Sequence, residues 1–511
     1  MISKVHSIAV NGLSSTIVDV EVDINPGLPK FNIVWLPDQG VQESRERLYS
    51  AIKSIKSHLP MTRITVNLAP ADIRKVGSMF DLPISIGILL NDGMIQTKEN
   101  LEKIIFIGEL SLDGKIRQVP SVLPSTIGAH ERWFKSIFVP KDNAQEASFV
   151  SGIEVIWVSH LQEVMDHLNG KTFVEAEKSP DFTQLLKIEQ DVKYDFKYII
   201  WQEQAKRALE IAASGGHNII MSGPPWSGKT LLAKSLSTIL PNLTLEESLE
   251  ISKVYSISGL LSSEFPIVTK RPFRSIHHTA SSISIIGWGR SAKPWEISLS
   301  HKGVLFLDEI LEFPKIVLEV LRQPLEDGYI TVTRVNASFI YPAKFMLVGA
   351  MNPCPCGYLT DPDKACTCNE FQVRNYASRL SWPLVDRVDM FIEVPKVKTE
   401  KFQQILDAST IETSFQIQAR VQAARELQLK RFTWKKITYN AEMSSAQINE
   451  FCKLDEHSEL LMRQAVWTMN LSARSYYRIL KLARTIADLE GVEDIKNSHI
   501  LEALSFRKKE T

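Results

Sequence analysis

The sequence predicts an α/β protein with a first mixed domain, a core built on a parallel sheet, and a helical C-terminal part. Two continuous apolar runs, GVLFLDE (303–309) and KFMLVGAMN (344–352), predict the core, because such runs are typical of strands buried on both faces. Apolar residues with three/four spacing predict the helical part, as in QARVQAARELQLKRF (418–432) and ARSYYRILKLARTIADLEG (473–491). Alternating strand-like and helix-like runs up to residue 170 predict the mixed domain.

The composition is that of a soluble globular protein, with 44% apolar and 23% charged residues in a chain of 511. This length predicts roughly two to four domains. Since the chain has no run of eighteen or more apolar residues and no secretion signal, we expect a cytoplasmic protein. Lys and Arg together number 59, as do Asp and Glu. This balance argues against coating of nucleic acid by bulk charge but permits a local basic channel.

Changes in pattern predict four segments: 1–170, a charged linker at 171–195, the core at 196–395, and the helical part at 396–511. The strands expected in the first segment are 15–24, 63–70, 104–110, 136–140 and 153–159. The helices expected there are 43–58 and 161–170.

The stretch GPPWSGKT (223–230) fits G-x-x-x-x-G-K-[ST], the phosphate-binding loop of nucleotide hydrolases, and is called the phosphate loop below. A strand is expected before it in HNIIMSG (217–223), and a helix after it in KTLLAKSLSTIL (229–240), stopped by Pro241. Backbone N–H groups of such a loop bind phosphate oxygens. The residues expected to bind nucleotide are Gly223, Pro224, Pro225, Trp226, Ser227, Gly228, Lys229 and Thr230.

Within this loop Lys229 is expected to reach the β- and γ-phosphates, and the Thr230 hydroxyl to hold Mg²⁺. Asp308 is expected to help position the Mg²⁺, and Glu309 to orient and deprotonate the attacking water. The alternative for these two carboxylates is a solvated acidic corner after a buried strand. Asn352 ends a later strand, where it would sense the γ-phosphate or the attacking water, or would simply terminate the strand.

Several motifs together resemble the YifB/ComM family of magnesium-chelatase-like AAA+ ATPases, and the resemblance covers essentially the whole chain. The motifs are GPPWSGKT, RPFRSIHHTAS, EISLSHKGVLFLDEILEF, VLRQPLEDG, MNPCPCG, LSWPLVDRVD and LSARSYYRILKLARTIADLEG. The resemblance implies an AAA+ core with a helical lid, ATP and Mg²⁺ as ligands, and a homo-oligomeric ring of six subunits. It also implies that each site lies between subunits and is completed by an arginine of the neighbour.

The family pattern places that arginine finger at Arg387, whose alternative role is a salt bridge to Asp386 or Asp389. The pattern also places Arg474 as a lid arginine that contacts nucleotide. Arg478 and Arg484 share its helix, whose apolar stripe is Ile479, Leu482, Ile486 and Leu489. We expect these two arginines to be solvated or interfacial.

Trp226 is unexpected, because the family has glycine at this position of the phosphate loop and glycine readily adopts positive φ. Further tryptophans fall at family glycines: Trp35, Trp201, Trp288, Trp295 and Trp382, and less certainly Trp133, Trp157 and Trp434. The chain has 23 glycines, about 4.5%, and counting its ten tryptophans as glycine gives about 6.5%, close to the usual ~7%. Our hypothesis is that UGA encodes glycine in this gene. The alternative is true tryptophan and an impaired loop.

The first domain resembles the ribosomal-S5-like fold of the Lon protease proteolytic domain, through ITVNLAPADIRKVGSMFDLPISIGIL (64–89). This resemblance aligns Asp81 with the Lon nucleophile and Ser125 with its paired lysine. Since a serine nucleophile needs a base, we expect a proteolytically inactive scaffold or substrate-contacting module. The neighbours Ser78 and Lys75 leave proteolysis as the alternative.

Four of the five cysteines, Cys354, Cys356, Cys366 and Cys368, form two C-x-C pairs within fifteen residues. Four thiolates in two close pairs could bind Zn²⁺ tetrahedrally, although C-x-C is not the usual spacing. The alternative is a loop of reduced thiols. His277 and His278 are expected to shape an insert near the ring pore or a subunit interface rather than to bind metal.

Three roles remain open for such a motor. The resemblance favours single-stranded or branched DNA, as in branch migration during natural transformation, with Arg271, Arg274 and Lys293 lining a pore. The second is a partner protein, as in magnesium chelatase, and the third is protein remodelling. No base-reading module is visible, so sequence-specific DNA binding is not expected.

Overall fold

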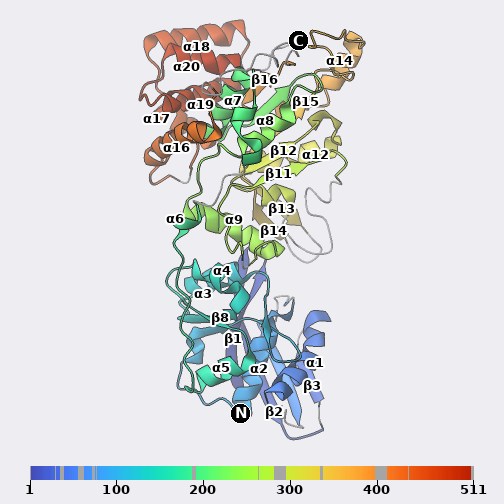
Figure 1. The fold of residues 1–511 in the computed structure, drawn as a ribbon, viewed down its shortest axis with the longest axis vertical. Helices are drawn as coiled ribbons and strands as arrows, with labels where there is room; N and C mark the ends of the chain where they lie inside the picture. The colour runs from blue at the N-terminus through green and yellow to red at the C-terminus, as the bar shows by residue number, and fades with distance from the viewer. Residues whose placement is uncertain are drawn as a thin grey trace.

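The computed structural model describes residues 2–28, 30–34, 39–55, 62–71, 75, 77–186, 192–262, 264–280, 295–333, 338–396, 411–435 and 437–507. Figure 1 shows an elongated molecule with the first domain at one end and the C-terminal helices at the other. The core with the parallel sheet lies between them. No helix among the described residues is long and apolar enough to cross a membrane.

The first domain is organised by a mixed sheet of seven strands in the order β3-β4-β2-β1-β5-β8-β9. These are β1 (Ser3–Asn11), β2 (Ser14–Asn25), β3 (Lys30–Val34), β4 (Arg63–Ala69), β5 (Ile104–Phe106), β8 (Ser136–Pro140) and β9 (Glu154–Val158). Residues in β2 and β4 alternate between more and less buried, because successive side chains of a strand point to opposite faces. The helices of this domain are α1 (Gln39–Ser54), α2 (Asp81–Asn91), α3 (Val122–Glu131), α4 (Ala144–Ser148) and α5 (Leu161–Leu168).

The core sheet is parallel throughout, in the order β11-β12-β15-β10-β16. Its strands are β10 (Ile219–Ser222), β11 (Phe273–Ile276), β12 (Val304–Leu307), β15 (Met346–Met351) and β16 (Met390–Glu393). All four residues of β12 are buried, as a sheet covered on both faces requires. Since Ser222 pairs with Met351, and Leu307 with Gly349, the segments that follow β10, β12 and β15 begin at the same sheet edge.

The helices α7 (Glu203–Gly215) and α8 (Lys229–Leu236) pack with this sheet in one hydrophobic core. The C-terminal region, residues 411–507, is called the lid and contributes α16 (Ser414–Arg431), α17 (Ser445–Phe451), α18 (Glu456–Thr468), α19 (Ala473–Leu489) and α20 (Asn497–Ser505). The predicted stripe of α19 faces this core, with Ile479, Leu482 and Ile486 buried. The predicted fold class is therefore confirmed: an α/β chain with a parallel-sheet core and a helical C-terminal region.

Several predicted elements differ in extent, among them α1, which spans Gln39–Ser54 where residues 43–58 were expected to be helical. The run 104–110 forms two strands, β5 and the short β6 (Glu109–Leu110), which pairs with β7 (Ile116–Arg117) instead of joining the large sheet. The helix after the phosphate loop ends at Leu236 and does not run to Pro241. From there Thr238 and Ile239 donate backbone hydrogen bonds three residues back, and the Ser237 and Thr238 hydroxyls bind carbonyls of the preceding turn.

The predicted linker is partly packed onto the first domain. The backbone N–H of Glu177 donates to the carbonyl of Val155 in β9 at 2.8 Å, and Ala176 forms a β-bridge with Ile156. A short helix, α6 (Phe182–Leu185), follows. The beginning of this charged segment therefore extends the first domain.

Among the described residues, the first domain contacts the core through a helix and through a β-hairpin. In α9 (Leu245–Ser258) the Ser256 hydroxyl donates to the buried Glu146 carboxylate of α4, and the Ser256 carbonyl accepts from the Ser121 N–H at 3.3 Å. The hairpin of β13 (Tyr329–Thr333) and β14 (Ser338–Pro342) places Phe339 against Gly12, where a Cβ would lie 2.8 Å from the ring. Two separate elements of the core thus hold the first domain.

Candidate functional site

The phosphate loop joins the end of β10 to the start of α8, as the sequence predicted. Gly228 has φ +87°, a conformation that favours glycine, and it immediately precedes α8. At Gly223 a Cβ would lie 2.2 Å from the carbonyl oxygen of Val394, which follows β16. The two glycines of the motif are therefore required by the backbone itself, one for its conformation and one for a close approach.

Lys229 directs its ammonium group into this loop. The Nζ donates to the carbonyl oxygens of Gly223 at 2.7 Å and Pro224 at 2.8 Å, and lies 3.5 Å from Oδ1 of Asn352. Burial lowers the pKa of Lys229 to about 8, although the negative charges of Asp308 and Glu309 act to raise it. The structure thus brings Lys229 and Asn352 together, although they are far apart in sequence.

Thr230 and Asp308 meet across the sheet edge. The Thr230 hydroxyl donates to Oδ2 of Asp308 at 2.9 Å. A hydroxyl and a carboxylate are ligands that suit Mg²⁺, and here they come from the loops after β10 and β12. The side-chain oxygens of the two residues predicted to hold Mg²⁺ therefore lie next to each other.

Glu309 lies beside them with its side chain half exposed. Its φ of +52° is rare for a residue other than glycine, and its N–H donates to Oδ1 of Asp308 at 3.1 Å. One carboxylate oxygen lies 3.1 Å from Nδ1 of His278, close to the end of the neighbouring strand β11. This left-handed turn directs the carboxylate away from the strand and toward the histidine.

The predicted arginines form a separate group at the boundary between core and lid. Arg387 forms an ion pair with Glu326 of α13 (Arg322–Asp327) and donates to the Pro383 carbonyl at 2.7 Å. Neither Asp386 nor Asp389, the alternatives from the sequence, pairs with it among the described contacts. Arg474 pairs with Glu326 at 3.3 Å and with Asp386 at 3.2 Å.

A cavity of about 510 Å³ beside these groups is lined by Arg387, Arg474 and Arg478. Among the described residues its lining includes none of the phosphate loop. The structure therefore brings Arg474 to Arg387 and not to the phosphate loop of its own chain. Arg478 lies at the same boundary within the chain, donating to the Val385 carbonyl at 3.3 Å and to Asp386 at 3.2 Å, and its expected position at a subunit interface stays a prediction.

Arg484 corrects another expectation. It is neither solvated nor at a subunit surface but 3% exposed inside the lid. Its Nε pairs with Asp488 at 3.0 Å and its Nη2 donates to the Val492 carbonyl at 2.7 Å. The guanidinium closes the end of α19 onto the following turn, a structural role.

The four predicted cysteines converge after β15. Their Sγ atoms all lie within 4.8 Å of one another, with 3.4 Å between Cys354 and Cys356 and 3.5 Å between Cys356 and Cys366. No disulfide joins them. Two C-x-C pairs on either side of a loop therefore form one cluster of sulfur atoms.

Comparison with known proteins gives matches along most of the chain. Three family models match: "Magnesium chelatase, subunit ChlI" over residues 195–402, "Subunit ChlI of Mg-chelatase" over 20–143, and "Magnesium chelatase, subunit ChlI C-terminal" over 411–507. The competence protein ComM of Haemophilus influenzae (strain ATCC 51907 / DSM 11121 / KW20 / Rd) is 41% identical, over 98% of this chain and 97% of its own. The chain belongs to the YifB/ComM family of magnesium-chelatase-like proteins.

YifB of Escherichia coli (strain K12) is 39% identical over 99% of this chain and 97% of its own. Lon protease 2 of Bacillus subtilis (strain 168) is 27% identical over 179 residues, which are 32% of each chain. The YifB/ComM family is therefore related both to magnesium chelatase and to Lon. An AAA+ core of this class implies ATP and Mg²⁺ as ligands.

Four of the seven described tryptophans at family glycines have the positive φ that favours glycine, whereas Trp157, Trp295 and Trp382 do not. Eight described residues other than glycine have positive φ, and four of them are tryptophans: Trp133 (62°), Trp201 (66°), Trp226 (66°) and Trp434 (72°). Trp133 and Trp434 follow α3 and α16, where a left-handed glycine commonly ends a helix. Trp35 and Trp288 lie outside the described residues.

Trp226 itself projects from the phosphate loop with 93% of its surface exposed. Its backbone conformation is one that costs about 1–2 kcal/mol for a residue with a Cβ and nothing for glycine. No partner holds the indole in this conformation, since almost all of it faces solvent. The glycine hypothesis thus agrees with the geometry of the loop and remains a prediction.

In the first domain, the two residues aligned with the Lon nucleophile and its lysine form hydrogen bonds within the fold. Asp81 is fully buried and accepts hydrogen bonds from Ser44 and from Nε of Arg47 at 2.8 Å. Ser125 is buried and donates to the Ser121 carbonyl at 2.7 Å. Burial raises the pKa of Asp81, and the Arg47 guanidinium opposes this.

The alternative pair does not meet in the described contacts either. The Ser78 hydroxyl donates to the Glu109 carboxylate, and the Lys75 ammonium donates to the Pro70 carbonyl. This geometry supports the expected scaffold role, because neither hydroxyl is hydrogen-bonded to a lysine.

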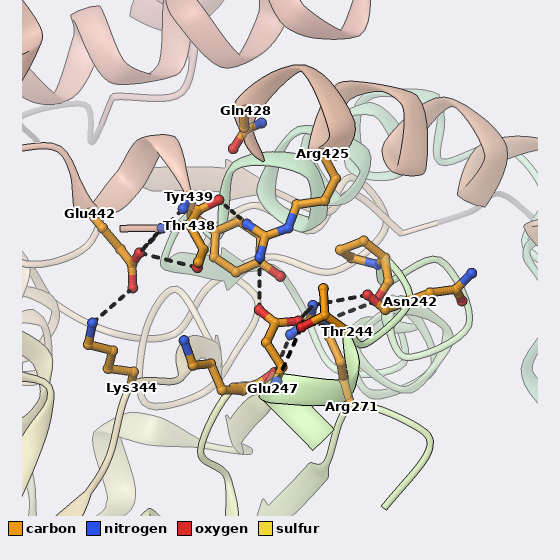
Figure 2. A network of polar contacts seen from close by, with 12 residues as sticks. Asn242, Thr244, Glu247, Arg271, Lys344, Arg425, Gln428, Thr438, Tyr439 and Glu442 are labelled. Carbon is orange, nitrogen blue, oxygen red and sulfur yellow. Dashed lines mark hydrogen bonds and ion pairs between the residues drawn. The ribbon is translucent and has the colours of Figure 1, made fainter. Parts of the chain in front are cut away.

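One basic residue that was predicted to line a pore is buried instead. Arg271 does not line a pore but is 8% exposed, and its Nη2 pairs with Glu247 of α9 at 2.6 Å (Figure 2). On the other side Glu247 pairs with Arg425 of α16 at 2.8 Å, and this guanidinium stacks 3.7 Å from the Tyr439 ring centroid. Arg274 forms a bidentate ion pair with Glu296 at 2.6 Å, and Lys293 lies outside the described residues.

Two residues near the site make contacts that the sequence did not predict. Glu326 lies in the quoted motif VLRQPLEDG, and its position just before the helix-ending Gly328 was the available signal. His278 was predicted only to shape an insert, and its sequence gives no indication that it faces Glu309. Parallel strands bring such residues together from distant parts of the chain.

Proposed function

We propose that this protein is an ATP-hydrolysing motor of the magnesium-chelatase-like AAA+ class, which assembles as a homo-oligomeric ring and acts on DNA in the cytoplasm. The observation that carries the ATPase part is the meeting of Thr230 with Asp308 at 2.9 Å, beside Lys229 and Asn352. Three loops that are separate in sequence supply these groups at one sheet edge. In open α/β sheets ligands bind at this edge.

In the proposed mechanism the phosphate loop and the first turn of α8 bind the phosphates through backbone N–H groups. Lys229 binds the β- and γ-phosphates. Thr230 and Asp308 would hold Mg²⁺, which would neutralise developing charge on the phosphate oxygens. Glu309 orients the attacking water and accepts its proton. Asn352 contacts the γ-phosphate or that water, and its distance of 3.5 Å from the Lys229 ammonium supports this position.

The position of the arginines supports the proposed ring assembly. Arg387 and Arg474 share Glu326, and the cavity beside them includes none of the described phosphate-loop residues. We propose that both guanidiniums enter the nucleotide site of the neighbouring subunit, with Arg387 as the arginine finger. A ring of six subunits is the arrangement proposed here.

DNA is the proposed substrate because the relative that matches at 41% identity over nearly the full chain is named a competence protein. The proposed activity is helicase-type branch migration on single-stranded or branched DNA in natural transformation and recombination. Non-specific DNA contacts would be made to phosphates and weaken as salt rises.

A second candidate is a motor that drives a partner protein, as in magnesium chelatase or protein remodelling. It is favoured by the family models, all three of which describe magnesium chelatase subunit ChlI. The domain that resembles Lon is a further feature a partner protein could contact.

We include one bound Zn²⁺ in the proposal, at Cys354, Cys356, Cys366 and Cys368. The support is the number and type of ligands, four thiols, and their mutual distances within 4.8 Å.

The test is ATP turnover of the purified protein with and without forked or single-stranded DNA at low salt. We expect turnover that DNA stimulates, and a Lys229→Ala variant without turnover. Hydrolysis that survives Lys229→Ala would remove the site assignment. Turnover that no DNA stimulates would favour the partner-driving motor.

A further inference from the structure

The cysteine cluster has the dimensions of a tetrahedral metal site. For Zn–S bonds of about 2.3 Å, two sulfurs of a tetrahedron are about 3.8 Å apart. The Sγ atoms of Cys354, Cys356 and Cys366 lie 3.4 to 3.7 Å apart, and all four cysteines are within 4.8 Å. The sulfur positions therefore require only a small adjustment to surround one ion.

The loop that carries these cysteines has little else to fix its shape. This cysteine loop, residues 353–369, connects β15 to α14 (Glu370–Ala377). Only Cys354 and Gly357 in it are buried, and its largest aliphatic side chain, Leu359, is 44% exposed. A segment without an apolar core commonly depends on a metal for its fold.

The cysteine loop rests on the phosphate loop. Gly357 has φ +84°, and a Cβ there would lie 2.8 Å from Cδ of Pro225 and 4.0 Å from Cγ of Asn352. The Gly357 N–H donates to the Cys354 carbonyl at 3.0 Å, so the glycine closes the turn that contains the first two cysteines. The glycine that follows the first C-x-C pair is thus packed closely against Pro225 of the phosphate loop.

A second tether joins the other side of the cysteine loop to the same region. Asp363 and Asp361 pair with Lys396 at 3.2 and 3.8 Å. Lys396 comes two residues after Val394, whose N–H donates to the Ser222 carbonyl at 2.7 Å and whose carbonyl contacts Gly223. Both the middle and the beginning of the phosphate loop therefore lie against groups connected to the cysteine loop.

We propose that the four cysteines bind one Zn²⁺ and that the zinc-closed loop holds the phosphate loop in its nucleotide-binding conformation, so that zinc loading controls affinity for ATP. This inference rests on the proposed ATPase function. It assigns the cysteines an effect on Pro225 through Gly357, and not a contact with nucleotide. They are positioning residues.

The first experiment measures zinc content and the affinity for a fluorescent ATP analogue in the same full-length preparation. We expect about one zinc per chain. After zinc is stripped with a chelator and removed by dialysis, binding in Mg²⁺-containing buffer should be at least tenfold weaker, and Zn²⁺ should restore it. Purified protein with less than a tenth of an equivalent of zinc would overturn the metal site, leaving a loop of reduced thiols.

The second experiment separates zinc binding from its effect. Cys366→Ser and Cys368→Ser should lose zinc and affinity together, whereas Cys452→Ala, outside the cluster, should keep both. Gly357→Ala should keep zinc but lose affinity at least fivefold, because its Cβ would displace Pro225. Circular dichroism confirms that each variant is folded.

The outcomes distinguish this inference from the function on which it rests. If the zinc-loaded wild-type protein binds no ATP analogue, the proposed ATPase function fails. If it binds the analogue equally well with and without zinc, the function stands and the coupling is wrong.

Discussion

Arg387 and Arg474 bind opposite oxygens of one carboxylate, that of Glu326. Arg387 follows α15 (Trp382–Val385) of the core and Arg474 begins α19 of the lid, so Glu326 connects the two parts. The hydrogen bond from Arg387 and its charge lower the pKa of Glu326, and Arg474 adds to this effect. The carboxylate is therefore ionised at neutral pH and holds both guanidiniums side by side.

The first prediction concerns Arg387 as a finger acting between subunits. Arg387→Ala should lower ATP turnover by a factor of about 10³ or more, because stabilisation of the transferring phosphoryl group is lost. Affinity for a fluorescent ATP analogue should change much less. Mixing Arg387→Ala with Lys229→Ala subunits should restore part of the turnover, since some interfaces then combine an intact loop with an intact finger.

The matched control is Arg463→Ala, which removes an exposed arginine paired with Glu459 on α18 and should leave turnover unchanged. Arg474→Ala should behave like Arg387→Ala in the mixing experiment. If mixing restores nothing although the mixed subunits co-assemble, the arginines do not act across the interface.

The second prediction separates binding from chemistry at Glu309. Glu309→Gln should bind the ATP analogue as wild type does, because the amide keeps the size of the side chain. Turnover should fall by about 10² or more, since the amide cannot accept the proton of water. Single-turnover kinetics and equilibrium binding measure the two effects, and equal losses in both would contradict a role confined to the chemical step.

The third prediction concerns the core–lid network in Figure 2. Glu247 lies between Arg271 and Arg425 and is 5% exposed. Glu247→Gln leaves two buried guanidiniums without a counter-charge, which should lower the free energy of unfolding of this unit by about 3–5 kcal/mol. Thermal unfolding measures it, with the exposed Glu370→Gln as the control that should change nothing.

The same residue predicts a pH dependence. Burial alone would raise the pKa of Glu247, but the Arg271 and Arg425 charges outweigh it and lower the pKa below its ordinary value. A carboxyl with a lowered pKa stabilises the fold above its unfolded pKa of about 4.3, and this contribution is lost as pH falls through the lower folded value. Between pH 6 and pH 3 the melting temperature should fall more steeply in wild type than in Glu247→Gln.

The fourth prediction is that the protein made by its own host carries glycine at position 226. Peptide mass spectrometry of the native protein reads this residue directly, and the gene should have UGA at this codon. An indole in the native peptide, or a UGG codon, would refute the hypothesis. In protein made with the standard code, Trp226→Gly should increase ATP affinity, because glycine adopts φ +66° without strain.

Trp467 provides the comparison for that substitution. It lies within α18, is 87% exposed and has no positive φ. Trp467→Gly should therefore leave ATP affinity unchanged and destabilise the lid by about 0.5 kcal/mol or less, because the residue lies in the last turn of α18 and tryptophan is itself a weaker helix former than alanine.

The strands of the core were predictable because a strand buried on both faces must be apolar throughout, as β12 and β15 are. The convergence of Lys229, Thr230, Asp308 and Asn352 was predictable for a related reason. Parallel strands end at one edge, and motifs at their ends must meet there. Local pattern and topology were sufficient for this half of the site.

Other contacts depend on packing that the sequence does not display. Arg271 and Arg484 look like ordinary surface cations in the sequence. In the fold both are buried, and they form ion pairs with Glu247 and Asp488. Their partners are distant in one case and one helical turn away in the other, and only the fold shows that both are shielded from water. The choice of Glu326 over Asp386 as the partner of Arg387 likewise depends on where α13 packs.

The contact of Phe339 with Gly12 has a consequence for dissecting the protein. Phe339 belongs to the core hairpin but packs on Gly12 in a turn of the first domain. In the same turn Leu13, which follows Gly12, packs against the hydrophobic cluster of the core. A fragment that begins after the linker would leave this aromatic ring and its apolar surroundings facing water. Such a shortened motor would tend to self-associate through the uncovered patch, so ring size is best measured on the intact polypeptide.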